Sequence, residues 1–180
     1  MGVRRKYIRD LAEQLIDEYR QRKPPIRVKH IAELLGIEVK LELVDDELSG
    51  FLYRDRKSGR TVIGANGNHH ANRINFTIAH ELGHFLLHEA ESVHLDERKP
   101  GYTLQLRNAN SSTGEDSNER EANLFAAELL MPARYLEKDL KEKNVDLIAD
   151  DDFLRNLALK YGVSVQALTI RLDYLGYVNH

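Results

Sequence analysis

The segment HELGH holds His80, Glu81 and His84, whose types and spacing suit metal chemistry. On a helix, residues four apart share a face, one turn apart along the axis, so both imidazoles can reach one ion. Imidazole nitrogens bind zinc at about 2.0–2.1 Å. A carboxylate beside such a site can take a proton from water as the water attacks a carbonyl. The pattern predicts a hydrolytic zinc site with Glu81 as general base; the alternative is an ordinary helix that carries two histidines.

A catalytic zinc site keeps three protein ligands, and the segment EREANLFAAELLM offers glutamates for the third. The segment reads as a helix, and its apolar residues can pack it on the HELGH helix with Glu119 directed at the metal. Glu121 is a rival, but it lies about 200° around the helix from Glu119, and Glu128 lies too far along. We therefore favour Glu119. Asn123, one turn on, could hold a ligand imidazole in its correct tautomer.

Further residues near the motif carry secondary expectations. Gly83 costs a helix roughly 1 kcal/mol against alanine, which makes sense if something approaches closely there. His88 has drifted about 80° from His80 around the helix, so we expect it outside the ligand set. Tyr102 and Arg171 are open candidates for an oxyanion donor. The remaining histidines near the motif lie in polar loops and are expected to be solvated: His69, His70 and His94.

The elements that position these residues follow from apolar periodicity. Residues 4–22 predict an amphipathic helix, and VKHIAELLG predicts a short second one. IEVKLEL alternates strictly and predicts a half-buried strand with Ile37, Val39, Leu41 and Leu43 on one face. GFLYR and TVIGA predict two more strands, so one small antiparallel sheet is expected.

The rest of the chain predicts mainly helices. HELGH falls in a helix over residues 72–89, followed by a polar stretch over 90–118 with a plausible strand at YTLQLR. The end of the chain predicts two helices joined at Gly162, with a helix-turn-helix cadence. The acidic run at 150–152 argues against DNA binding by this pair. We expect an α+β fold: the sheet packs on the HExxH helix and the second ligand-bearing helix, with a zinc metallopeptidase domain at 1–143 and a helical extension at 144–180.

Composition narrows the class of protein. The chain has 180 residues, 42% of them hydrophobic and 31% charged, which predicts a globular protein of one domain. No apolar run approaches the ~20 residues needed to cross a membrane, and the first residues lack a signal peptide. Cysteine is absent, which suits the cytoplasm.

Net charge is −3, yet residues 1–29 hold nine Lys/Arg against four acids, a balance of +5. A solvated helix face explains this best; an acidic partner or nucleic acid is the alternative.

FTIAHELGHFLLH followed by EREANLFAAELLMP resembles the ImmA/IrrE family of bacterial and phage metallopeptidases, over roughly residues 5–135. The resemblance implies that His80, His84 and Glu119 bind Zn²⁺ and that Glu81 is the general base. Family members cleave or inactivate helix-turn-helix repressors and so release mobile-element or stress genes. We therefore expect a zinc-dependent endopeptidase acting on a separate repressor protein. The alternative is a non-catalytic regulatory module that uses zinc for its fold and binds a repressor or antitoxin.

Overall fold

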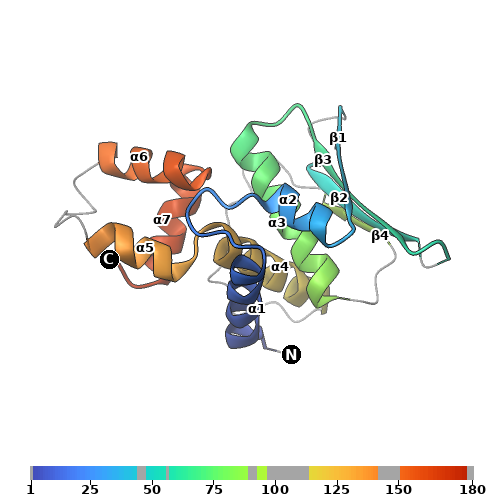
Figure 1. The fold of residues 1–180 in the computed structure, drawn as a ribbon, viewed down its shortest axis with the longest axis horizontal. Helices are drawn as coiled ribbons and strands as arrows, with labels where there is room; N and C mark the ends of the chain where they lie inside the picture. The colour runs from blue at the N-terminus through green and yellow to red at the C-terminus, as the bar shows by residue number, and fades with distance from the viewer. Residues whose placement is uncertain are drawn as a thin grey trace.

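The computed structural model describes residues 2–43, 48–55, 57–88, 93–96, 114–141 and 151–177. A small sheet lies at one end of the molecule and three helices lie at the other, with α1, α2, α3 and α4 between them (Figure 1). The elements in chain order are α1 (Arg5–Glu18), α2 (Val28–Leu34), β1 (Glu38–Glu42), β2 (Gly50–Asp55), β3 (Arg60–Asn66), α3 (Ala71–Leu87), β4 (Val93–Asp96), α4 (Gly114–Leu130), α5 (Ala133–Lys141), α6 (Asp151–Tyr161) and α7 (Val165–Tyr174). The α+β class is confirmed.

The sheet has four strands in the order β1-β3-β2-β4. β2 and β3 form the predicted antiparallel hairpin, and β2 also pairs antiparallel with β4. β1, however, pairs parallel with β3, so the sheet is mixed rather than purely antiparallel. β4 was not predicted, because its four residues lie in a stretch that reads as a polar loop. The strand predicted at YTLQLR falls outside the described residues.

The predicted apolar face of β1 is buried only near its start. Ile37 is buried, whereas Leu41 and Leu43 are 52% and 78% exposed. The buried end is the one that continues directly from α2, which packs against β1. Alternation correctly indicated a strand here, but the prediction that all four apolar side chains share a buried face was wrong.

The core lies between α3, α4 and the helices around them. α3 packs on α4, on the sheet through β2 and β3, and on α2, while α1 also packs on α4. α1 buries the four apolar residues spaced along its inner face: Ile8, Ala12, Leu15 and Ile16. This helix ends at Glu18, earlier than predicted, because Arg20 takes a left-handed conformation with φ 53°. Within the described residues, no helix combines the length and apolar character needed to cross a bilayer.

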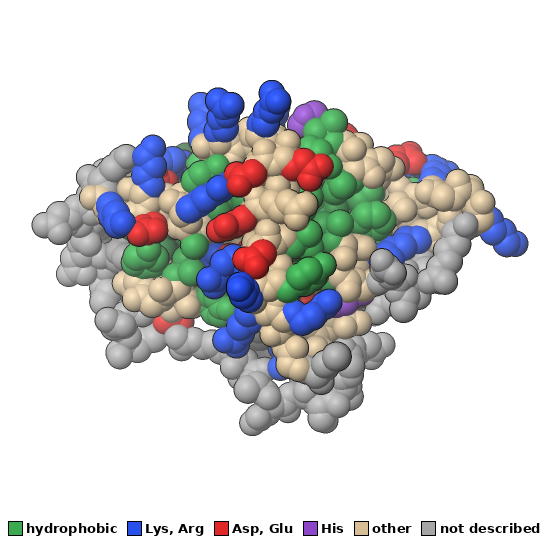
Figure 2. All heavy atoms as spheres, turned by 60° about the horizontal axis from the view of Figure 1, so that its bottom comes forward, with side chains coloured by type: hydrophobic (Ala, Val, Ile, Leu, Met, Phe, Trp, Pro, Cys, Tyr) green, Lys and Arg blue, Asp and Glu red, His purple; other side chains and the backbone are tan. Residues whose placement is uncertain are grey.

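The positive charge of the first residues is partly used inside the molecule. Arg4 donates to Glu121, and Arg9 lies 3.6 Å from the Glu128 carboxylate, so both cations hold α1 against α4. Figure 2 brings this side of the molecule forward, and Lys and Arg side chains lie beside Asp and Glu side chains in the middle of the face. These contacts give part of the basic segment a structural role.

The carboxyl-terminal helices form the predicted pair. Gly162 has a φ of +66°, which lets the chain turn between them, and Ser164 caps α7 by accepting from the backbone N–H of Ala167 at 3.1 Å. Their apolar faces join the same hydrophobic core as the other helices. The predicted boundary between residues 143 and 144 falls in a stretch outside the described residues, and it stays a prediction.

Candidate metal centre

Helix α3 buries the histidines of the HELGH segment among apolar neighbours. His80 is 0% exposed and His84 is 1% exposed, because Phe76, Ile78 and other apolar residues of α3 face the core. Their rings meet edge to face with centroids 4.7 Å apart, and the two Nε2 atoms are 3.1 Å apart. Each imidazole therefore directs its Nε2 atom at one common point.

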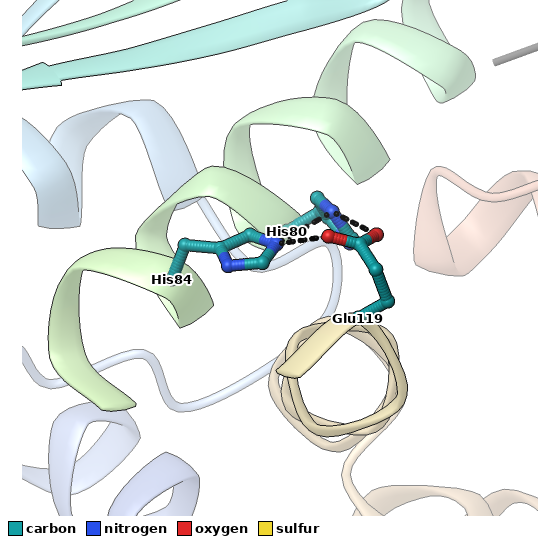
Figure 3. Close-up of side chains that lie close together, drawn as sticks. All are labelled: His80, His84 and Glu119. Carbon is teal, nitrogen blue, oxygen red and sulfur yellow. Dashed lines mark hydrogen bonds and ion pairs between the residues drawn. The ribbon is translucent and has the colours of Figure 1, made fainter. Parts of the chain in front are cut away.

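Glu119 reaches that point from the first half of α4 (Figure 3). Its Oε1 lies 3.0 Å from His84 Nε2, and its Oε2 lies 3.4 Å from His80 Nε2. A tetrahedral site with bonds of about 2.05 Å has ligand-to-ligand edges of roughly 3.3 Å. The three observed separations fit such a site, and two imidazoles with one carboxylate form a known donor set for a catalytic metal.

Asn123 lies one turn beyond Glu119, against the other side of the His80 ring. Its Oδ1 is 3.1 Å from His80 Nδ1. The amide oxygen can only accept, so this contact assigns the proton to Nδ1 and leaves the Nε2 lone pair facing the cluster. The arrangement is the one expected of a residue that fixes a ligand tautomer.

The surroundings of Glu119 favour the ionised form of its carboxylate. Burial by itself raises the pKa of Glu119, but the neighbouring imidazoles of His80 and His84 outweigh it and hold that pKa well below its usual range. The Glu119 side chain is 31% exposed, in contrast to the buried histidines. The cluster is thus an anionic oxygen with two imidazole nitrogens, and it reaches solvent on the Glu119 side.

Glu81, the expected general base, is 0% exposed and lies beneath the start of β2. A Cβ added to Gly50 would overlap the Thr77 side chain and would lie 3.7 Å from Glu81 Oε1. Gly50 therefore permits the strand to pack directly on this face of α3. This role of Gly50 was not predicted; a glycine at the start of a predicted strand was the available signal.

The rival glutamates are engaged elsewhere. Glu121 is held by Arg4, whose backbone N–H and Nε donate at 2.9 and 3.0 Å. Glu128 forms a buried pair with Arg171, whose Nη1 donates at 3.0 Å and whose Nε donates to Met131 O. Neither carboxylate joins the cluster, in line with the preference for Glu119.

Arg171 was one of two candidates for an oxyanion donor, and its pairing with Glu128 argues against that role. Arg171 is fully buried on α7 and donates to Glu128 and to a backbone carbonyl, so it serves the packing of α7 on α4. Sequence could not show this, because the partner lies 43 residues away in the chain. The other candidate, Tyr102, falls outside the described residues.

The other histidines lie outside the cluster. His88 is 8% exposed, and its Nε2 lies 3.2 Å from Asn118 O and 4.0 Å from Glu121. Burial, together with the neighbouring His84, lowers the pKa of His88. His70 is exposed and caps α3 by accepting from the N–H of Asn72, while His69 is half-buried rather than fully solvated. His94 belongs to β4 rather than to a loop.

The two ligand-bearing helices approach each other closely at Gly83. A Cβ placed on Gly83 would lie 3.1 Å from both Ala122 Cα and Phe125 Cδ1, and 3.3 Å from Ala122 O. The sequence indicated a close approach, and the structure identifies the approaching element as α4. The absent side chain at Gly83 lets α4 come near enough for Glu119 to reach the histidines.

Comparison with known proteins agrees with this geometry. The sequence model of the IrrE N-terminal-like domain, Peptidase_M78, matches residues 32–173. The chain belongs to this metallopeptidase family. The family match confirms the resemblance to ImmA/IrrE proteins and extends beyond residue 135 into α7. "Uncharacterized immunity region protein 2" of Bacillus phage phi105 is 28% identical over 149 residues, which cover 83% of this chain and 82% of that protein.

Proposed function

We propose that this protein is a zinc-dependent endopeptidase that cleaves or inactivates a helix-turn-helix-type repressor in the cytoplasm. The observation that carries the proposal is the position of Glu119, whose two oxygens lie 3.0 and 3.4 Å from the Nε2 atoms of His84 and His80. An HExxH helix alone is a short motif. A third ligand delivered to the same point by a separate helix is what a catalytic site requires.

In this proposal His80, His84 and Glu119 hold Zn²⁺, and neighbouring groups support two of these ligands. Asn123 keeps the lone pair of His80 Nε2 available, and the low pKa of Glu119 keeps its carboxylate ionised. A bound zinc ion supplies Lewis acidity toward water and toward a carbonyl oxygen. With three protein ligands, one coordination position would remain open for such an oxygen.

Glu81 is assigned the proton transfers. It accepts a proton from the attacking water and passes it to the nitrogen of the departing amine, so the peptide bond is exchanged for a carboxylate and an amine. The Glu81 side chain follows His80 directly on α3 and is shielded from bulk solvent. A positioned general base of this kind contributes roughly 10²–10⁴-fold to a rate.

The proposed substrate is a separate repressor protein. Support comes from the peptidase family, which implies a protein substrate, and from the phage relative, whose name places it in an immunity region. The competing candidate is a module that binds a repressor or antitoxin and uses the metal only to hold α3 against α4. Burial of both histidines between these helices is the observation that favours it.

Glu81→Gln separates the two functions. The purified variant and the wild type are incubated with candidate repressors, and cleavage is followed by mass spectrometry alongside zinc content. The enzyme proposal expects the variant to keep zinc and to lose cleavage by roughly 10²–10⁴-fold. Glu137→Gln is the matched control, because Glu137 is exposed on α5 and pairs only with Lys141 among the contacts of the described residues. Repressor binding without cleavage by the wild type, unchanged in Glu81→Gln, would reject the enzyme in favour of the module.

A further inference from the structure

Arg54 of β2 holds the end of the helix that carries the metal-binding histidines. Its Nη2 donates to the backbone carbonyls of His84 and Phe85, both at 2.9 Å. The guanidinium also lies over the Phe85 ring, 5.0 Å from its centroid. One side chain from the sheet thus contacts the backbone of a proposed ligand and of the residue after it.

This contact falls where the helix most needs support. α3 ends at Leu87, so His84 lies in its last turn, where carbonyls lack partners within the helix and the chain tends to fray. The carbonyl of His84 accepts one further bond, from the N–H of His88 at 3.1 Å. A cation at a helix carboxyl end also interacts favourably with the helix dipole. Arg54 therefore stabilises the turn that presents the His84 imidazole.

The other end of β2 is fixed to the same helix. Ser49, the residue before β2, accepts a hydrogen bond from Arg73 Nη2 at 2.8 Å, and Gly50 packs on Thr77. Strand and helix run in the same direction along these contacts. The five residue steps of extended chain from Ser49 to Arg54 span about 16 Å, and the eleven residue steps of helix from Arg73 to His84 also span about 16 Å. Because the two lengths match, contacts at both ends of β2 can hold α3 at the same time.

We propose that Arg54 is a positioning residue of the metal centre. By binding the carbonyls of His84 and Phe85, it fixes the last turn of α3 and thereby the direction in which His84 Nε2 points. The inference rests on the proposed function, since it takes His84 to be a metal ligand. Groups that orient metal ligands without touching the metal typically change metal affinity by 10–100-fold when they are removed.

The test compares the zinc affinity of the wild type with that of Arg54→Ala, Arg54→Lys and Arg60→Ala. Affinity is measured by competition with a chromophoric chelator, after circular dichroism of each metal-free protein has shown that it is folded. Arg60 is the matched control, because it is an arginine on the neighbouring strand β3 that pairs with the exposed Glu38. The visible spectrum of each cobalt-substituted protein reports the ligand geometry separately from affinity.

Arg54→Ala is expected to bind zinc at least tenfold more weakly, with an altered cobalt spectrum. Arg54→Lys should recover part of the loss, because an ammonium group can also donate to two carbonyls. Arg60→Ala should match the wild type. If Arg54→Ala does not fold, Arg54→Lys must still bind more weakly than Arg60→Ala. A folded Arg54→Ala with wild-type affinity and spectrum would overturn this inference alone, whereas a wild type that binds no zinc would overturn the proposed function as well.

Discussion

Replacing Gly83 by alanine tests how closely the two ligand-bearing helices must pack. The substitution has two opposing effects on the free energy of unfolding. Alanine is the better helix former by roughly 1 kcal/mol, so an uncrowded helix would gain stability. At Gly83 the new methyl group would lie 3.1 Å from the Cα of Ala122 and from Phe125 Cδ1. Because the first of these atoms is backbone, α4 itself must move by a few tenths of an ångström.

The magnitude follows from comparing the two effects. Forcing a methyl group into a well-packed core typically costs about 1–3 kcal/mol. Set against the helix gain of roughly 1 kcal/mol, the net result is a loss of about 1 kcal/mol, within a range of about 0–2. The same displacement carries Glu119 away from His80 and His84, so zinc affinity should fall together with stability.

Urea unfolding of the metal-free protein measures the first effect, and chelator competition measures the second. Gly2→Ala is the matched control, because a Cβ at Gly2 would meet no atom within 4 Å, and it should be nearly neutral in both assays. The prediction would be wrong if Gly83→Ala were more stable by about 1 kcal/mol and bound zinc as tightly as the wild type. That result would mean that a methyl group at Gly83 fits against α4 without displacing it.

Two further predictions concern side chains on α4. Asn123→Ala should weaken zinc binding by about 10–100-fold, whereas Asn123→Asp should retain it, because a carboxylate can also accept the Nδ1 proton of His80; chelator competition checks both. Glu128→Ala leaves Arg171 buried without its carboxylate and should lower the free energy of unfolding by about 3–5 kcal/mol, measured by urea unfolding. Joining Glu128→Leu with Arg171→Met should cost much less than the sum of the single changes, and strict additivity would contradict the pairing.

The predictable part of the site was set by local geometry. His80 and His84 are four residues apart on one helix, and the helical repeat alone places them together. The facing of Glu119 relative to Glu121 also follows from that repeat, once the two helices are assumed to pack. The close approach at Gly83 was also predictable, because a glycine in the middle of an apolar helix costs stability unless another group packs closely against it.

What sequence could not supply depends on contacts between distant segments. The parallel pairing of β1 with β3 is decided by where the chain crosses the sheet, which alternation does not encode. β4 is short and lies in a polar stretch, yet it pairs with β2 across the sheet. Arg54 carried no prediction and Arg171 was a candidate for an oxyanion donor. Their observed roles appear only when their partners on α3 and α4 are in place.

The exposed part of β1 shows the limit of periodicity as a signal. Leu41 and Leu43 keep the apolar alternation of a half-buried strand, but both are largely exposed. Periodicity reports which side chains share a face of the strand. It does not report whether another element covers that face.

The zinc content of the purified protein tests the three-ligand metal site of His80, His84 and Glu119. Elemental analysis of purified protein, after equilibration with zinc and removal of the excess, is carried out for the wild type and for Glu119→Ala. We expect about one zinc ion per wild-type chain and a clearly lower zinc content in the variant, because two imidazoles alone leave the site one ligand short. No zinc in the wild type under metal-replete conditions would contradict it and would leave HELGH as a helix with two buried histidines.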